Sequence, residues 1–166
     1  MRLLPGLLAM TLLASTAGAQ TDPTVPPAGA KAILTLTGVG VQIYACRDSA
    51  DGPAWTFVAP EAKLVDEHGA ETGTHGAGPV WMLKDGSSVK GRVVATRASL
   101  DASSIPWLLL KAAETKGPGV LAGVAFIRRS ETVGGKARPT GCDAGHLGAI
   151  DKVPYKAIYT FYGDAL

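Results

Sequence analysis

Short runs of alternating apolar and polar residues, separated by glycine, proline and polar turns, make up most of the chain after residue 30. The clearest is VWMLKDGSSVKGRVVATRA, where Asp85-Gly86 stands between two alternating arms, as in a β-hairpin. Near the C-terminus, VPYKAIYTFY places one aromatic-rich face on Tyr155, Ala157, Tyr159 and Phe161. Such runs recur about every 10 residues without a long amphipathic helix. The pattern predicts an all-β fold, a single antiparallel β-sandwich or barrel of about eight or nine short strands.

Glycine and proline interrupt several of these runs. Gly38 and Gly40 divide AILTLTGVGVQIYAC, which predicts two strands around a glycine turn, and Pro60 divides AWTFVAPEAKLV into two short strands. Residues 104–116 have two interpretations. Ser104 could cap a helix, or the apolar run that follows it could form a buried strand paired with VLAGVAFIRR. The surrounding strand pattern favours the second interpretation.

The first residues have the features of a signal peptide. Arg2 precedes an apolar run, and Ala17-Gly18-Ala19 matches a small-residue cleavage pattern. We therefore expect residues 1–19 to be removed by cleavage near Ala19, and the protein to be exported to the periplasm or the extracellular medium. The apolar run is shorter than the roughly 20 residues that a membrane-spanning helix needs, so no membrane span is predicted.

The rest of the chain has the composition of one globular domain. Proline-rich residues 20–30 predict an extended, solvated leader, and residues 31–166 a single β domain. The formal net charge is +2, with 16 basic and 14 acidic residues, and Arg128-Arg129 is the only pair of adjacent basic residues. A nucleic-acid-binding protein would normally carry a basic stripe, so no nucleic-acid partner is expected.

The two cysteines, Cys46 and Cys142, are far apart in the sequence. In an oxidising compartment such a pair most often forms one disulfide, which we expect here. The alternative is a metal site made by Cys142 and His146, with His75 as a third ligand. The sequence lacks the histidine and methionine pattern of a copper site, so neither a metal nor another cofactor is predicted. The disulfide would hold the irregular segment 130–152 against the strand that carries Cys46.

The stretch GTHGAGPVW, residues 73–81, contains the best candidates for a site. His75 is the candidate catalytic residue, because an imidazole titrates near neutral pH, although the sequence places no carboxylate beside it. In the structural interpretation, the glycines form a loop with His75 at its tip. Trp81 is the candidate ligand-stacking surface. Arg128 and His146 are further binding candidates, because the long irregular segment lies beside Arg128 and Arg129 and contains His146. No G-x-S-x-G, H-E-x-x-H or phosphate-binding motif occurs, so no enzyme class is predicted.

Several segments together resemble a known family. GVQIYAC, PEAKL, GTHGAGPVW, DGSSVKG, IPWLLLKA, FIRRSETVGGKARPTGC and VPYKAIYTFY follow one another here in this order. The order is similar to that of a family of secreted bacterial and fungal proteins, the domain of unknown function numbered three-four-five-five, over about residues 32–162. The resemblance implies an exported single domain and assigns it no activity, ligand or catalytic residue.

Three functions fit these features. The preferred hypothesis is an exported module that binds a small molecule or glycan near His75, Trp81 and the 130–150 segment, because β-scaffolds often bind ligands at their loops. The first alternative is a hydrolase-type enzyme that uses His75 with a carboxylate partner. The second is an envelope or extracellular domain that interacts with another protein.

Overall fold

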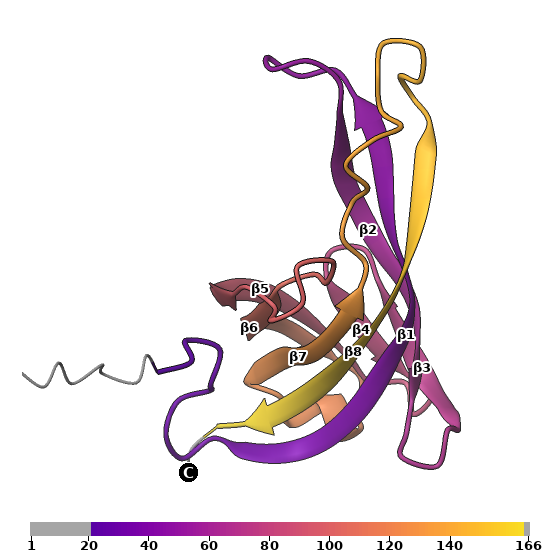
Figure 1. Ribbon diagram of the computed structural model, residues 1–166. Coiled ribbons are helices and arrows are strands. Elements are labelled where there is room, and N and C mark those ends of the chain that lie inside the picture. Colours follow the sequence, from indigo (N-terminus) through magenta and orange to yellow (C-terminus); the bar gives the residue numbers. More distant parts are fainter. Residues whose placement is uncertain (1–20, 165–166) are drawn as a thin grey trace, which may run out of the picture.

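The computed structural model describes residues 21–164, so the predicted signal peptide lies outside the described residues. Eight antiparallel strands form one closed barrel (Figure 1). In chain order they are β1 (Lys31–Arg47), β2 (Ala54–Val65), β3 (Glu71–Gly76), β4 (Val80–Leu83), β5 (Ser88–Arg97), β6 (Trp107–Lys116), β7 (Phe126–Gly134) and β8 (Ile150–Gly163). Each strand pairs with the next, and β8 pairs with β1. The predicted all-β antiparallel fold is confirmed, and of the two architectures it is the barrel.

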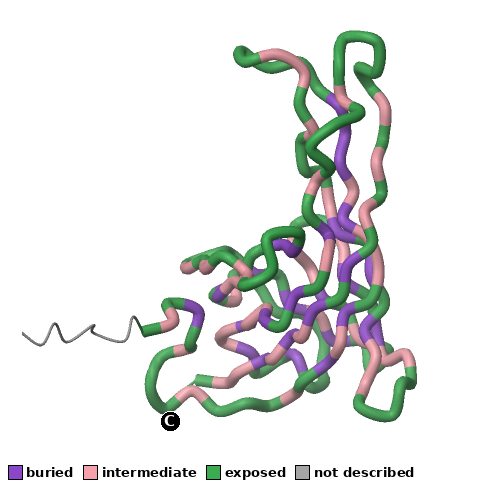
Figure 2. The backbone as a smooth tube through the Cα atoms, viewed as in Figure 1, coloured by how far each residue is buried: buried purple, intermediate pink, exposed green. Residues whose placement is uncertain are grey.

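Three strands are longer than the barrel is tall. β1, β2 and β8 continue past its rim as a three-stranded extension, which rises from the barrel in Figure 1. The pairing continues to the tip, where Arg47 faces Ala54 and Ala45 faces Ile150. Buried residues gather in the barrel and thin out along the extension (Figure 2). The barrel therefore holds the core, and the extension is a mostly exposed appendage.

The predicted glycine turn at Gly38 and Gly40 is wrong. β1 runs without a break from Lys31 to Arg47, and neither glycine has a positive φ. Gly38 instead lies against a ring of the core: a Cβ atom there would stand 2.5 Å from Cε2 of Tyr159. The absence of a side chain at Gly38 makes room for the ring of Tyr159 from β8. In the sequence, a glycine needed for such a close contact cannot be distinguished from a glycine needed for a turn.

The predicted break at Pro60 is also wrong, because β2 is continuous from Ala54 to Val65. Pro60 faces Gln42 of β1, whereas the pairing of β2 with β3 begins only at Ala62. On the edge of β2 that faces β3, Pro60 therefore lies outside the paired residues. A proline lacks the N–H that a second neighbour would need, so this position tolerates it.

Residues 107–116 form strand β6, which pairs with β5 and β7, so the strand interpretation of 104–116 is confirmed and the helix is wrong. Ser104 caps no helix; its Oγ accepts a hydrogen bond from the backbone N–H of Gly134 at 2.9 Å. The predicted hairpin at Asp85-Gly86 is confirmed, since Gly86 has φ 85° in the turn between β4 and β5.

An apolar core fills one part of the barrel interior. It includes Leu36, Leu64, Val89, Leu121, Val124, Ile127 and Phe161. Leu121 belongs to a 3₁₀ turn, η1 (Val120–Gly123), whose first backbone N–H groups donate to Asp85 and to the Ser87 hydroxyl. Within residues 21–164, no helix has both the length and the apolar character needed to cross a membrane.

The predicted disulfide between Cys46 and Cys142 is confirmed. It ties the loop 135–149 to the extension, where the Trp55 indole N–H also donates to the Thr140 carbonyl at 3.0 Å. β7 ends at Gly134 and β8 starts at Ile150, so the irregular segment is shorter than the sequence predicts.

The leader is not fully solvated. The Asp22 carboxylate accepts hydrogen bonds from Arg97 and Arg128 at 2.9 and 2.8 Å, and Thr24 is completely buried. Both guanidinium groups lie over the ring of Trp107. Burial would raise the Asp22 pKa, but hydrogen bonds from Thr24 and Arg97 and the charge of Arg128 lower it to about 2. This ion-paired cluster fastens residues 22–24 to the outside of β5, β6 and β7.

Candidate functional site

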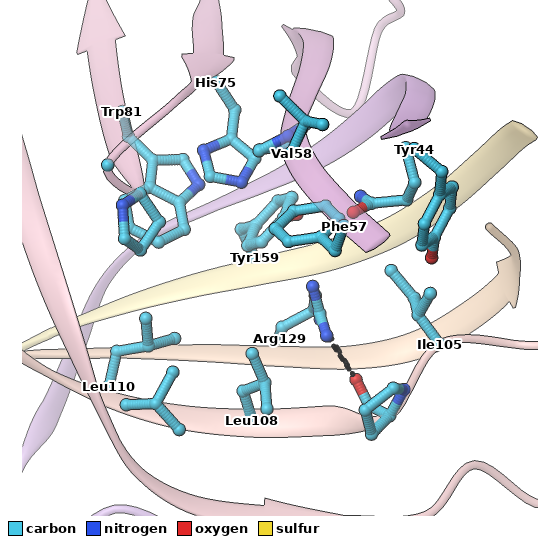
Figure 3. A pocket seen from close by; sticks show the side chains of 16 residues that line it. Tyr44, Phe57, Val58, His75, Trp81, Ile105, Leu108, Leu110, Arg129 and Tyr159 are labelled. Carbon is cyan, nitrogen blue, oxygen red and sulfur yellow. Dashed lines mark hydrogen bonds between the residues drawn. The ribbon is translucent and has the colours of Figure 1, made fainter. Parts of the chain in front are cut away.

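The barrel interior beyond the core contains a cavity of about 330 Å³. All eight strands contribute to its wall (Figure 3), with Gln42, Phe57, His75, Trp81, Val93, Leu108, Arg129 and Tyr159 as representatives of β1 to β8 in turn. An eight-stranded barrel is wide enough either to be filled by its own side chains or to hold one small ligand. A space of this size lies at the lower end of the range for small-molecule sites.

Three aromatic rings that pack against one another line the cavity on the side of the core. His75 faces Trp81 across the β3–β4 pair, and their rings lie parallel with centroids 4.3 Å apart. Tyr159 meets both rings edge-on, at 5.1 Å from His75 and 5.4 Å from Trp81. Trp81 and Tyr159 also belong to the core cluster, so the rings form a rigid floor.

His75 lies within β3 and not at a loop tip, which corrects the structural interpretation of this stretch. Of its glycines, only Gly78 has a positive φ, at 101°, so the chain turns there and the histidine faces the cavity. His75 Nδ1 is 2.9 Å from the Val80 carbonyl oxygen. A carbonyl can only accept, so Nδ1 carries the proton. Burial lowers the His75 pKa to about 4, with a further contribution from the charge of Arg129, and the ring is neutral at neutral pH.

Two buried donors in the cavity wall lack partners. Neither Trp81 Nε1 nor Gln42 Nε2 forms a hydrogen bond to any residue that the structure describes. The two side chains are 1 % and 2 % exposed. Gln42 lies near the Tyr155 hydroxyl, but its Nε2 and that hydroxyl are not positioned to form a hydrogen bond. A buried donor without a partner costs about 1 to 3 kcal/mol, so a ligand that draws either side chain slightly into the cavity would gain a hydrogen bond there.

Arg129 brings a positive charge to the same cavity. Its Nε and Nη2 donate to the Pro106 carbonyl at 3.0 and 2.8 Å, one of which is the dashed line in Figure 3. The sequence-based prediction placed Arg129 beside the irregular segment but chose its neighbour Arg128 as the binding candidate. Side chains alternate along a strand, so Arg129 shares the inward face with Ile127, while Arg128 faces out. The burial of Ile127 was the signal that could have identified it.

The other predicted binding residues lie elsewhere. Arg128 is on the outer surface, where it pairs with Asp22, and His146 is exposed in the loop 135–149 with its Nδ1 2.7 Å from Asp143. Cys142 is occupied by the disulfide. Over residues 21–164, no cluster of three or more histidine, cysteine or acidic side chains is placed to hold a metal ion. Of the four candidates, the structure places Trp81 and His75 together in the cavity wall.

The chain was also compared with known proteins. Residues 27–163 match the model of a family described as "Protein of unknown function (DUF3455)". The chain belongs to this family. The DUF3455 match covers all eight strands and agrees with the resemblance seen over residues 32–162. Searches of curated proteins and of solved structures found no match.

Proposed function

We propose that this barrel is an exported binding module that takes one small, predominantly apolar molecule into its cavity. The observation that supports the proposal is the cavity itself: about 330 Å³ inside the barrel, lined by residues of every strand and walled mainly by aromatic and aliphatic side chains. Protein interiors are normally packed as densely as organic crystals, with few voids larger than a water molecule. A space of this size therefore fits a bound molecule better than it fits a structural core.

The entrance has an apolar rim. Phe57, Val58 and Val93 line the cavity and are 51 %, 45 % and 48 % exposed. Such a rim would bury apolar surface on a molecule that enters, and burial of apolar area is the main source of affinity in sites of this kind. The predicted signal peptide and the disulfide support export, because disulfides persist in oxidising compartments.

A small apolar molecule fits the cavity better than a glycan does. Sugar rings stack on open aromatic faces and need many polar partners, whereas Trp81 is buried within the floor. The hydrolase alternative gains no support. The described hydrogen-bond partner of His75 is the backbone carbonyl of Val80 and not a carboxylate, and a pKa of about 4 makes the imidazole a weak base.

The test is the binding of a neutral apolar dye, N-phenyl-1-naphthylamine, followed by its fluorescence. Val93 and Val94 are adjacent in β5 and similarly exposed, but Val93 lines the cavity and Val94 does not. In the variant Val93→Trp an indole would occupy the cavity. The variant Val94→Trp adds the same group outside it and is the matched control.

We expect the wild-type protein and Val94→Trp to bind the dye with equal affinity, and Val93→Trp to bind it at least tenfold more weakly. Circular dichroism and thermal unfolding would establish that both variants are folded. A wild-type protein that does not enhance the fluorescence would contradict the proposal. Equal binding by the two variants would place the dye outside the cavity and would do the same.

A further inference from the structure

We infer that the ligand is a monocarboxylate: an apolar body that lies on the aromatic floor, with one carboxylate bound to Arg129. This inference rests on the proposed function and adds the charge of the ligand to it. Three features of the cavity carry it, namely a cation without an acidic partner, a fixed geometry of that cation, and two further donors in the same wall.

The first feature is the unbalanced charge. Among the described residues that line the cavity, Arg129 is the only one with a permanent charge. No aspartate or glutamate within residues 21–164 forms an ion pair with it. Arg97 and Arg128, on the outside of the same wall, both pair with Asp22. Arg129 is half-buried, so its guanidinium group is accessible from the cavity, and an anion that enters would meet a cation that no acidic side chain already neutralises. The cavity supplies the cation and lacks the anion.

The second feature is the orientation of the guanidinium group. Nε and Nη2 both donate to the Pro106 carbonyl, which holds the group in place, and the guanidinium group also lies near the Tyr159 hydroxyl. Figure 3 shows the other end of Arg129 directed into the space below Tyr159 and Phe57. A guanidinium group held in this way needs little reorganisation to bind a carboxylate, because its planar set of donors matches the two oxygens.

The third feature is the pair of unpartnered donors. Trp81 and Gln42 both line the cavity, and both side chains are almost completely buried, so their unpartnered nitrogens lie just behind its wall. A small shift of either side chain on binding would let it donate to an acceptor oxygen of the ligand. The count of charges favours a carboxylate over a phosphate monoester, since one arginine balances one negative charge and a phosphate carries nearly two. The wall thus matches a singly charged acceptor group on an apolar body.

Matched acid and amide probes test the inference. Decanoate and decanamide have nearly the same size, as do 2-naphthoate and 2-naphthamide, and each pair differs in charge. Isothermal titration calorimetry at neutral pH would give the dissociation constants for the wild-type protein and for Arg129→Met, Arg129→Lys and the control Arg92→Met. Arg92 is an exposed arginine of β5 outside the cavity, so its substitution removes the same charge from the molecule.

We expect at least one acid to bind the wild-type protein roughly 10- to 100-fold more tightly than its amide, as a charge-assisted hydrogen bond implies. Arg129→Met should abolish this ratio and leave amide binding unchanged, Arg129→Lys should retain part of it, and Arg92→Met should retain all of it. If Arg129→Met does not fold, the lysine variant and the wild-type ratio still decide the question.

The failures are distinguishable. Equal binding of acid and amide by the wild-type protein would overturn the carboxylate inference and leave the apolar binding function standing. A ratio that Arg92→Met reduces as much as Arg129→Met would overturn it as well, because the effect would then come from net charge. A dye that does not bind in the preceding experiment, together with no binding of any acid or amide, would overturn the proposed function itself.

Discussion

Substitution of Gly38 by alanine would place a methyl group where the ring of Tyr159 stands. The added Cβ would lie 2.5 Å from Cε2 and 3.1 Å from Cδ2 of that ring. The ring cannot swing away, because His75 and Trp81 pack against it at centroid distances of 5.1 and 5.4 Å, and the Tyr159 side chain is completely buried. The backbone or the floor of the cavity must therefore shift.

Overpacking of this kind costs about 1 to 3 kcal/mol. Alanine recovers about 0.5 to 1 kcal/mol relative to glycine within a strand, so we expect a net loss of up to about 2.5 kcal/mol in the free energy of unfolding. Guanidinium chloride denaturation of the oxidised protein would measure it. The control is Gly76→Ala in β3, where no described atom lies within 4 Å of the added Cβ and φ is not positive. We expect that variant to be unchanged or slightly more stable.

A double-mutant cycle separates this contact from general strain in β1. Tyr159→Leu removes the ring whose atoms the new methyl group would meet. The cost of Gly38→Ala should therefore fall by about 1 kcal/mol or more in the Tyr159→Leu background. Additive costs, or a Gly38→Ala variant as stable as Gly76→Ala, would refute the argument that Gly38 is there to accommodate the ring.

Three further predictions concern the disulfide and two titrating groups. Replacement of Cys46 and Cys142 together by alanine opens a link of 96 residues and should lower the free energy of unfolding by about 4 to 5 kcal/mol, measured by denaturation; a loss below about 1 kcal/mol would contradict the loop-closure argument. The pKa of Asp22 is about 2 instead of 3.8, so its contribution is complete above the higher value and is lost as pH falls through the lower one. Asp22→Asn should lose about 1 to 2 kcal/mol at neutral pH, less than the full shift implies because the side chain is partly exposed, and should be less sensitive to acid; equal acid sensitivity would count against this role. Because burial lowers the pKa of His75 from 6.5 to about 4, the unfolded chain takes up the proton first, and acidification between these values should cost the wild-type protein up to about 3 kcal/mol. His75→Gln should flatten that part of the stability profile, and an NMR titration in which the His75 ring protonates near pH 6.5 would disprove the shift.

The strands and the disulfide could be predicted because their signals are local or compositional. Alternation of apolar residues shows a strand without knowledge of its neighbours, and Asp85-Gly86 shows a hairpin from two residues. The two cysteines allow only one intramolecular pair. Gly38 and Pro60 could not be interpreted correctly in the same way. Their roles depend on a ring from β8 and on the unpaired edge of β2, both of which are set by the register of the barrel.

The site was predictable only in part for a related reason. His75 and Trp81 are close in sequence, and the hairpin between them brings their rings together. Arg129 reaches the same cavity from the far side of the barrel, so its contribution depends on which face of β7 points inward. The predicted candidate, Arg128, is its neighbour in the strand and lies on the outer surface, because one residue along a strand reverses the direction of the side chain.

The Trp81 indole N–H resonance offers the most direct test of the cavity as a binding site. The protein has three tryptophans, and their roles differ: Trp81 Nε1 has no hydrogen-bond partner among the described residues, Trp55 Nε1 donates to Thr140, and Trp107 lies beneath Arg97 and Arg128 on the outside. A titration with 2-naphthoate followed by ¹H–¹⁵N correlation spectra should shift the Trp81 signal in a saturable manner and leave the other two in place. A Trp81 signal that stays fixed while the outer tryptophans move would contradict the account.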